Sequence, residues 1–553
     1  MGEHADEVGL GPVITGLTAP GAEFEMETVT VPGPRGVDVV MRVYRRGPHT
    51  LRDLLVATEA FADRTFTVYQ GERCTYGEHR ALVAGLARWL RDAHGLVPGD
   101  RVAIAARNVP EWSVTFFAAA CAGLVAVPLN AWWSVSELEW AVADSGSRVV
   151  VADPERAAML AGSGVPVVRV RGGGPPPDGV IEWDDVTRAF DPDPSLPDVP
   201  VAPDDDATIL YTSGTTGRPK GAVGTHRNHC TNILNTALSG RAGRELSGAE
   251  PPADPGLLLA YPLFHIAGIN GLVGAALTGA KLATLYRWDP AEARALVREE
   301  RLDRTAGVPS TMAQLVDGGP GADPADLASL TSIGMGGAPI PPELVARIGQ
   351  GLGKGAANGY GLTETTSAVC FNAGADYLAH PDSVGRPYPG AELRIDSPDD
   401  AGVGELWFRG PNVVRGYWNN PEADAAAFVD GWFRTGDLGH VRDGWVYVVD
   451  RLKDVVLRGG ENVYSVQVES AVHEVPGVVE VAVFGVPHAN LGEEVAALVR
   501  VASGAARDDD AVRAVVTARV GAFAAPAHVR WTDEPLPRTA TGKIRKKEIR
   551  ESF

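Results

Sequence analysis

The sequence contains little cysteine and no long apolar run. Only four of its 553 residues are cysteines, and no two of them have CxxC spacing, which favours reduced thiols over a zinc site or a disulfide framework. No uninterrupted apolar stretch reaches the roughly 18 residues that a membrane-spanning helix needs. The first residues are acidic where a signal peptide would be basic. We therefore expect a cytoplasmic protein.

Basic residues are also fewer than acidic residues. The chain has 50 Lys and Arg residues against 70 Asp and Glu residues, which gives a formal net charge of -20 at pH 7. This excess of negative charge disfavours loose association with nucleic acid or with an anionic membrane. We expect neither partner, so any phosphate-bearing ligand must be held by a local site.

Length and composition predict more than one domain. A chain of 553 residues with 45% hydrophobic residues is too long for one ordinary domain and can fill sizeable cores. Helix-like and strand-like stretches alternate over 51–153, which is typical of a mainly parallel sheet. The predicted division is an N-terminal extension at 1–50, a large domain of sheets flanked by helices at 51–450, a hinge at 451–453 and a small domain at 454–553.

Local signals place several elements. Ser134 and Glu137 have the spacing of a capping box, so a helix is expected to begin there, followed by a buried strand at 149–152. The stretches 172–206 and 243–256 are rich in Gly, Pro and Asp, and both are expected to be surface connections.

The most informative segment is YTSGTTGRPKG at 211–221, directly after an apolar stretch. Its glycines leave backbone amides accessible, its hydroxyls can donate hydrogen bonds and Lys220 supplies a positive charge, which together suit a polyphosphate. The spacing is not that of a Walker motif. From composition alone, a loop without a ligand stays an alternative.

This segment resembles the phosphate-binding signature of the adenylate-forming superfamily, which includes acyl- and aryl-CoA synthetases, firefly luciferase and the adenylation domains of peptide synthetases. Five further motifs resemble that family in the expected order: PLFHIAG at 262–268, GMGGAP at 334–339, NGYGLTET at 358–365, TGD at 435–437 and PRTATGK at 537–543. The resemblance covers about 51 to 546. It implies an α/β fold with a large N-terminal domain and a small, mobile α+β C-terminal domain that rotates about a hinge at Lys453.

The resemblance also implies roles for individual residues. The residues expected at ATP or AMP are Thr212, Ser213, Gly214, Thr215, Thr216, Gly217, Lys220, Gly337, Ala338, Pro339, Asn358, Gly359, Tyr360, Gly361, Thr363, Asp437, Arg451 and Lys543. Thr212 and Glu364 are expected at Mg²⁺. Lys543, His265 and Thr216 are expected to act in catalysis, because a mobile lysine stabilises charge that builds on the α-phosphate and the histidine borders the carboxylate.

The acid and thiol sites are less clearly marked. The expected acid pocket is formed by His265, Ile266, Asn270, Met335, Gly336 and Thr365, and the expected coenzyme A site by Gly459, Gly460 and Glu461. Three positions depart from the common family pattern. Asp450 stands where glycine is frequent, Ser465 stands where proline is frequent, and Thr225 is preceded by Ala-Val-Gly where a bulkier apolar run is common.

The leading interpretation is an acid:CoA ligase. It would use ATP and Mg²⁺ to convert a small carboxylic acid, fatty or aromatic, into acyl-AMP with release of pyrophosphate, and would then form acyl-CoA and AMP. Transfer to a carrier-protein thiol or an amine, use of a nitrite-type oxyanion as the substrate, and a binding protein without activity stay as alternatives. The sequence does not identify the acid. A homodimer stays an alternative to a monomer.

Overall fold

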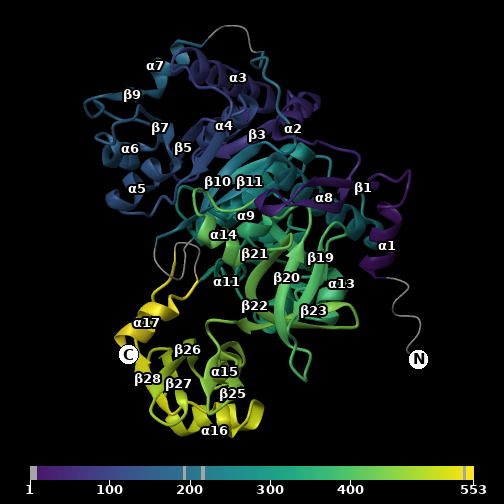
Figure 1. Ribbon diagram of the computed structural model, residues 1–553, viewed down its shortest axis with the longest axis vertical. Coiled ribbons are helices and arrows are strands. Elements are labelled where there is room, and N and C mark those ends of the chain that lie inside the picture. The colour runs from purple at the N-terminus through teal and green to yellow at the C-terminus, as the bar shows by residue number, and fades with distance from the viewer. Residues whose placement is uncertain (1–8, 191–194, 213–217, 320, 540–542) are drawn as a thin grey trace. The chain divides into compact units, whose positions relative to one another are not determined.

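The computed structural model describes residues 9–190, 195–212, 218–319, 321–539 and 543–553 (Figure 1). The chain divides into two compact units: a large unit of 1–392 and 408–433, and a small unit of 393–407 and 434–553. None of the described helices is both long and apolar enough to cross a bilayer.

A seven-stranded sheet carries the first half of the large unit. Its strands lie in the order β11 (Lys220–Thr225), β10 (Asp206–Thr212), β6 (Val125–Pro128), β5 (Arg101–Ala105), β7 (Ser147–Ala152), β8 (Val167–Arg169) and β9 (Val180–Glu182). The pairs are parallel except for β10 with β11. The helices near this sheet are α2 (Leu51–Ala57), α3 (Tyr76–Asp92), α4 (Pro110–Cys121), α5 (Val135–Ser145), α6 (Pro154–Leu160) and α7 (Trp183–Arg188).

Alternating residues of its strands pack on opposite faces of this sheet. Val102 and Ile104 of β5 belong to the buried cluster that includes α3 and α4. Ala103 and Ala105 of the same strand belong to the cluster that includes α5 and α6. Because side chains alternate along a strand, a sheet covered on both faces needs apolar residues at consecutive positions.

A nine-stranded sheet completes the large unit's core. Its order is β18 (Arg386–Pro387), β17 (Ser367–Ala373), β16 (Gly355–Leu362), β15 (Ser332–Gly336), β14 (Arg304–Gly307), β12 (Gly256–Leu259), β13 (Lys281–Thr284), β3 (Thr65–Tyr69) and β4 (Glu72–Thr75). α9 (Ile266–Thr278) packs in one buried cluster, and α10 (Pro290–Glu300), α11 (Pro309–Asp317), α12 (Pro342–Ala346) and α13 (Gly374–Ala379) in the other. The remaining elements are α1 (Leu10–Leu17), β1 (Met26–Pro32), η1 (Pro34–Gly36), β2 (Asp38–Tyr44), η2 (Thr58–Phe61), α8 (His226–Ser247), η3 (Pro324–Leu327), η4 (Arg347–Gly351), η5 (Thr363–Thr365), α14 (Pro421–Ala427) and β21 (Phe428–Val429).

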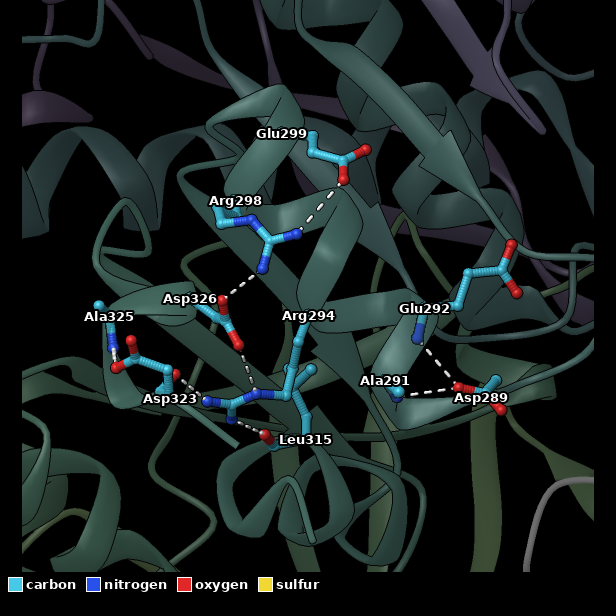
Figure 2. A network of polar contacts seen from close by, with 10 residues as sticks. All are labelled: Asp289, Ala291, Glu292, Arg294, Arg298, Glu299, Leu315, Asp323, Ala325 and Asp326. Carbon is cyan, nitrogen blue, oxygen red and sulfur yellow. Dashed lines mark hydrogen bonds and ion pairs between the residues drawn. The ribbon is translucent and has the colours of Figure 1, made fainter. Parts of the chain in front are cut away.

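A network of charged groups joins α10 to α11 and η3 (Figure 2). Buried Arg294 donates to the carbonyl oxygen of Leu315 at 2.7 Å and to that of Asp323. Arg298, one helical turn later, donates to Asp326 at 2.7 Å. All three guanidinium nitrogens of Arg294 have a protein acceptor, so the network is a structural tie between α10, α11 and η3.

The small unit has a sheet of its own with order β25 (Glu461–Val463), β24 (Val456–Arg458), β27 (Gly492–Val501) and β26 (Val478–His488), and β28 (His528–Thr532) pairs with β27. Val483 and Val499 pack with α15 (Ser465–His473) and α16 (Asp509–Arg519), whereas Ala482 and Phe484 pack with α17 (Lys546–Ser552). The remaining elements are β19 (Glu392–Asp396), β20 (Gly404–Arg409), β22 (Trp432–Arg442), β23 (Trp445–Arg451) and η6 (Ala522–Ala524).

The structure confirms the α/β class and corrects two local predictions. Helix α5 begins after Ser134, whose side chain and that of Glu137 form the expected capping box, and the strand expected at 149–152 lies within β7. The stretch 172–206 is not merely a connection, because it contains β9 and α7, and α8 extends to Ser247 within the second stretch. Gly243 lies within α8 despite the low helix propensity of glycine.

Candidate active site

The described ends of the phosphate-signature segment lie on two paired strands. β10 and β11 pair antiparallel with Thr212 opposite Lys220 and Tyr211 opposite Gly221. The hydroxyl of Thr212 donates to the carbonyl oxygen of Lys220 at 3.4 Å. The predicted residues Ser213, Gly214, Thr215, Thr216 and Gly217 lie outside the described residues. The two predicted residues that flank them are therefore brought together by strand pairing.

A segment far away in sequence lies along the outer edge of β11. The amide of Val223 donates to the carbonyl oxygen of Gly416 at 2.9 Å, and the amide of Trp418 donates to that of Gly221 at 2.7 Å. Between these bonds Tyr417 pairs antiparallel with Ala222. The segment 413–418 thus extends the hairpin by a strand-like stretch.

Tyr417 connects two of the predicted site residues. Its hydroxyl donates to Oε1 of Glu364 at 2.7 Å, and the Nζ atom of Lys220 lies 5.2 Å from the centre of its ring. The amide of Val414 donates to the carbonyl oxygen of Glu364 at 2.9 Å. Burial, together with the negative charge of Glu364, raises the pKa of Tyr417, so the hydroxyl keeps its proton. Tyr417 was not among the predicted site residues, because no spacing in the sequence pairs it with Glu364.

Two parallel strands lead into a glycine-rich segment at 336–339, which we call the glycine-rich wall. β15 and β16 place Met335 opposite Asn358 and Gly336 opposite Gly359. A Cβ atom at Gly336 would lie 2.7 Å from the carbonyl oxygen of Gly359, so only glycine fits there. Gly337 follows with a φ of +80°, and it leads into Ala338 and Pro339. The ring of Tyr360 lies 6.2 Å from that of Phe408.

The turn after β16 fixes Glu364. In η5 the hydroxyl of fully buried Thr365 accepts from the amide of Leu362 at 2.9 Å. The side-chain amide of Asn412 donates to the carbonyl oxygen of Thr365 at 3.0 Å. Thr366 and Ser367 both have positive φ, which is costly for residues with a side chain and is held here by these bonds. Thr363 is the first residue of this turn, and Thr365 stabilises the turn through hydrogen bonds with backbone groups.

The histidine of the PLFHIAG motif caps a helix. Nδ1 of His265 accepts from the amide of Ala267 at 3.2 Å at the start of α9. Its ring is stacked on Tyr261 with a centroid distance of 6.2 Å. The hydroxyl of Tyr261 lies 2.8 Å from the carbonyl oxygen of Gly307 and 3.2 Å from that of Gly336. Tyr261 therefore links His265 to the glycine-rich wall.

Of the other predicted acid-pocket residues, two are buried and one contacts a neighbouring helix. Ile266 and Met335 are both only 4% exposed and belong to buried clusters. Asn270 follows Ile266 by one helical turn on α9, and its side-chain amide lies 3.4 Å from the hydroxyl of Thr236 on α8.

In the small unit, the predicted ribose-binding residues form a pair. Asp437 on β22 lies opposite Arg451 at the end of β23, and Nε of Arg451 is 3.2 Å from Oδ1 of Asp437. Asp437 is 4% exposed, and its carboxylate forms an ion pair with this guanidinium group of the neighbouring strand. Strand register therefore brings together two residues that are fourteen positions apart in the sequence.

Lys543 ends a second small hairpin. The amide of Thr539 donates to the carbonyl oxygen of Lys543 at 2.7 Å, and Arg538 pairs antiparallel with Ile544. The side chain of Lys543 is exposed. Arg538 is in turn paired with Glu480, whose other carboxylate oxygen accepts from Arg500 at 2.7 Å. The lysine is thus exposed on a hairpin whose base is fixed by charged groups.

The predicted thiol-side residues lie in a tight turn. Gly459 and Gly460 connect β24 to β25, and their φ values of +63° and +92° are those of a two-residue hairpin turn. Glu461 directly follows this turn and is exposed, as is the predicted hinge residue Lys453.

Two of the departures from the family pattern, Asp450 and Ser465, contact one another. The hydroxyl of Ser465 donates to Oδ1 of buried Asp450 at 3.2 Å, and the backbone amide of Ser465 donates to Oδ2. Nζ of Lys546, three residues after Lys543, lies 2.7 Å from the hydroxyl of Ser465 and 2.7 Å from Oε1 of Glu469. These two departures are therefore parts of one buried polar cluster that fixes the end of the Lys543 hairpin.

Comparison with known families gives two matches along the chain. Residues 55–418 match the model described as AMP-binding enzyme, and residues 467–543 match the model described as AMP-binding enzyme C-terminal domain.

Named relatives match most of the chain. A feruloyl-CoA synthase from an Amycolatopsis species is 39% identical over 496 residues, which is 87% of this chain and 94% of the relative. The long-chain-fatty-acid–CoA ligase FadD13 of Mycobacterium tuberculosis (strain H37Rv) is 34% identical over 490 residues, which is 87% of this chain and 93% of that protein.

Solved structures agree in fold. ATP-bound MatB from Rhodopseudomonas palustris has a TM-score of 0.80 at 30% identity and covers 91% of this chain and 99% of its own. The o-succinylbenzoate CoA synthetase MenE from Bacillus subtilis, in complex with its acyl-adenylate intermediate, has a TM-score of 0.76 at 26% identity and covers 90% of this chain and 97% of its own. These matches confirm the fold and the superfamily that the motifs predicted. The chain belongs to the AMP-binding enzyme family, and it is an AMP-forming acid–thiol ligase.

Proposed function

We propose that this ligase activates an aromatic or fatty carboxylic acid as its acyl-adenylate and then passes the acyl group to coenzyme A. The observation that carries the proposal is the meeting of Lys220 and Glu364 at Tyr417, directly beside the phosphate-signature hairpin. A cation and a carboxylate at the base of such a hairpin suit a magnesium-bound polyphosphate.

In the first half-reaction a carboxylate oxygen of the acid attacks the α-phosphorus of ATP. An O–P bond forms to give the acyl-adenylate, and the bond from the α-phosphorus to pyrophosphate breaks. Lys220 and the hydroxyl of Thr212 bind phosphate oxygens, and the ammonium group of Lys543 stabilises the charge that develops on the α-phosphate. The exposed position of Lys543 supports this assignment, because an exposed side chain is accessible to a ligand.

In the second half-reaction the sulfur of coenzyme A attacks the acyl carbon. A C–S bond forms, the C–O bond to AMP breaks, and the thiol proton is released to solvent or a base. We assign His265 to the edge of this site, since its ring lies on Tyr261 next to Gly336. Gly459, Gly460 and Glu461 are assigned to coenzyme A, and Lys453 to the hinge.

The residues that we assign to AMP lie between 336 and 451 in the sequence. We assign Tyr360 and the wall of Gly336, Gly337, Ala338 and Pro339 to the adenine, because an aromatic face and bare backbone allow close stacking. Asp437 is assigned to the ribose hydroxyls, with Arg451 beside it. Asn358, Gly359, Gly361 and Thr363 complete this part of the site.

The residues present fit a magnesium ion. Glu364 offers a half-exposed carboxylate and Thr212 a half-exposed hydroxyl, both of them hard oxygen donors of the kind that Mg²⁺ prefers. When bound, the ion would neutralise charge on the phosphate oxygens. Tyr417 holds the carboxylate of Glu364 for this role through its hydrogen bond.

The test is an ATP–pyrophosphate exchange assay with a panel of hydroxycinnamic, benzoic, medium-chain and long-chain acids, followed by mass analysis of the products with and without coenzyme A. We expect acid-dependent exchange for at least one class, and a thioester only when coenzyme A is present. Adenylate without thioester would redirect the second step to a carrier protein or an amine. Absence of exchange with every acid would contradict the proposal.

A further inference from the structure

Tyr417 contacts two groups of opposite charge at the phosphate site. Its hydroxyl donates to Oε1 of Glu364 at 2.7 Å, while the face of its ring lies 5.2 Å from the ammonium nitrogen of Lys220. A hydrogen bond to an ionised carboxylate is stronger than one between neutral groups, and a cation is attracted to the face of an aromatic ring. One side chain therefore restrains both charges.

Tyr417 is itself held by its surroundings. It is 8% exposed, its amide donates to Oδ1 of Asp424 at 2.6 Å, and its ring lies 5.7 Å from that of Phe428. Its pairing with Ala222 ties it to the strand that follows the phosphate-signature segment. Because neither backbone nor ring can move far, the positions of its two partners are restrained relative to β11.

The geometry points to Tyr417 as a positioning residue for the metal-bound nucleotide. We propose that its hydroxyl fixes the orientation of the Glu364 carboxylate so that the remaining oxygen, Oε2, faces the cation, and that its ring holds Lys220 beside the phosphates. The inference rests on the proposed function, since it assigns Glu364 and Lys220 to magnesium and ATP. It adds a residue that acts through Glu364 and Lys220 and not by direct contact with magnesium or ATP.

The first test separates the hydroxyl from the ring. Tyr417→Phe removes the bond to Glu364 and keeps the ring near Lys220, so ATP affinity measured by calorimetry without metal should stay within about twofold of wild type. The gain in affinity on adding Mg²⁺ should fall by about tenfold, which corresponds to one lost charge-assisted hydrogen bond. Tyr417→Leu removes the ring as well and should also weaken metal-free ATP binding.

Tyr44→Phe is the matched control. Tyr44 also donates a 2.7 Å hydrogen bond from a buried hydroxyl, in this case to Asn235, which is far from the predicted site residues in sequence and is not assigned to the site. Its loss should cost some stability and leave the effect of Mg²⁺ on ATP affinity unchanged. An equal effect of both substitutions on the Mg²⁺ response would mean that Tyr417 is only structural.

A double-mutant cycle tests whether Tyr417 acts through Glu364. If it does, Tyr417→Phe combined with Glu364→Gln should bind Mg²⁺-ATP no worse than Glu364→Gln alone, because the carboxylate on which the hydroxyl acts is already gone. Additive losses would overturn the inference. Should Tyr417→Phe alone fail to fold, this pair still decides, since it removes both partners and leaves no carboxylate without its donor.

The outcomes distinguish this inference from the proposed function. If wild type shows acid-dependent exchange and its Mg²⁺ response is kept in Tyr417→Phe, only the inference fails. If wild type shows no exchange with any acid, the proposed function fails, whereas the calorimetric result still reports on Tyr417.

Discussion

At the scale of single residues, the residues proposed for the site are common side chains whose properties come from their neighbours. Asp437 is buried and paired with Arg451, Glu364 is bonded by Tyr417, and Lys543 is exposed at the end of a hairpin. Charges that are held before the ligand arrives cost little reorganisation during the reaction. The contribution of each group can therefore be tested by removing one charge at a time.

Replacing Lys543 by alanine should slow adenylation by about 100-fold to 1,000-fold, because a charge that stabilises the developing phosphate charge is lost. The melting temperature should change little, since the side chain is exposed. The measurement is ATP–pyrophosphate exchange with a good acid substrate. Lys547→Ala, which removes an exposed lysine on α17 paired only loosely with Glu551 at 3.8 Å, is the control and should keep the wild-type rate.

At the scale of elements, tight turns place the reactive groups. The turn between β16 and β17 presents Glu364, and the close approach of the two strands there leaves no room at Gly361: a Cβ atom would lie 1.8 Å from the carbonyl oxygen of Ser367. Thr366 and Ser367 in the same turn have positive φ. This turn is therefore strained and sensitive to added volume.

Gly361→Ala should destabilise the large unit by about 3 kcal/mol or more, because the new methyl group forces the strands apart. It should also lower the Mg²⁺ response, since Glu364 moves with the turn. Gly240→Ala in α8 is the matched control. Its new Cβ would have its nearest neighbour at 3.6 Å, and helix propensity predicts a gain of up to about 1 kcal/mol. Urea unfolding of the two variants checks both signs.

A second element-scale prediction concerns Asp450 and Ser465. Asp450→Gly should destabilise the small unit by about 2–4 kcal/mol, because the buried amide and hydroxyl of Ser465 lose their acceptor. Ser465→Pro should be harmful alone but should add little to Asp450→Gly. Proline removes the amide that needs Asp450, and it is well tolerated at the first position of a helix such as α15. Hydrogen exchange of peptides from 454–553 measures the coupling, and strictly additive effects would contradict it.

At the scale of the whole molecule, each unit has its own hydrophobic core, and three histidines are buried among the described residues of the large unit. Burial lowers the pKa of His79 and of His229 to about 3 and that of His226 to about 4. Their ring nitrogens contact neutral groups: Nε2 of His79 lies 3.0 Å from the hydroxyl of Ser113, and Nε2 of His229 lies 2.9 Å from that of Thr208. The folded state therefore holds these rings neutral.

The large unit should lose stability as pH falls below about 6.5, because the unfolded chain then binds protons that the folded state excludes. With a folded pKa of about 3 against about 6.5 when unfolded, each of His79 and His229 should contribute a loss on the order of 2 kcal/mol between pH 7.5 and pH 5. Urea midpoints at the two pH values measure this. His79→Gln should show a smaller difference between them, and an unchanged difference would contradict the assignment.

Motifs along the chain predicted the class of fold and the superfamily before the structure was known. The hydroxyl-rich and glycine-rich motifs, the capping box before α5 and the alternating pattern of 51–153 indicated the α/β class and the adenylate-forming superfamily. These features are local: a capping box or a phosphate-binding turn needs only a few neighbouring residues, so short stretches carry their signal.

The sequence by itself determined the family and the fold class, and it supplied the residues that we propose as reactive groups. Only the tertiary structure decided which of these groups touch: Tyr417 with Glu364 across 53 positions, Tyr261 with Gly336 across 75, and Asp450 with the serine that departs from the family pattern. It also placed β9 and α7 where composition indicated a connection. The physical reason is that such contacts follow from strand register and the packing of segments distant in sequence, which no local spacing encodes.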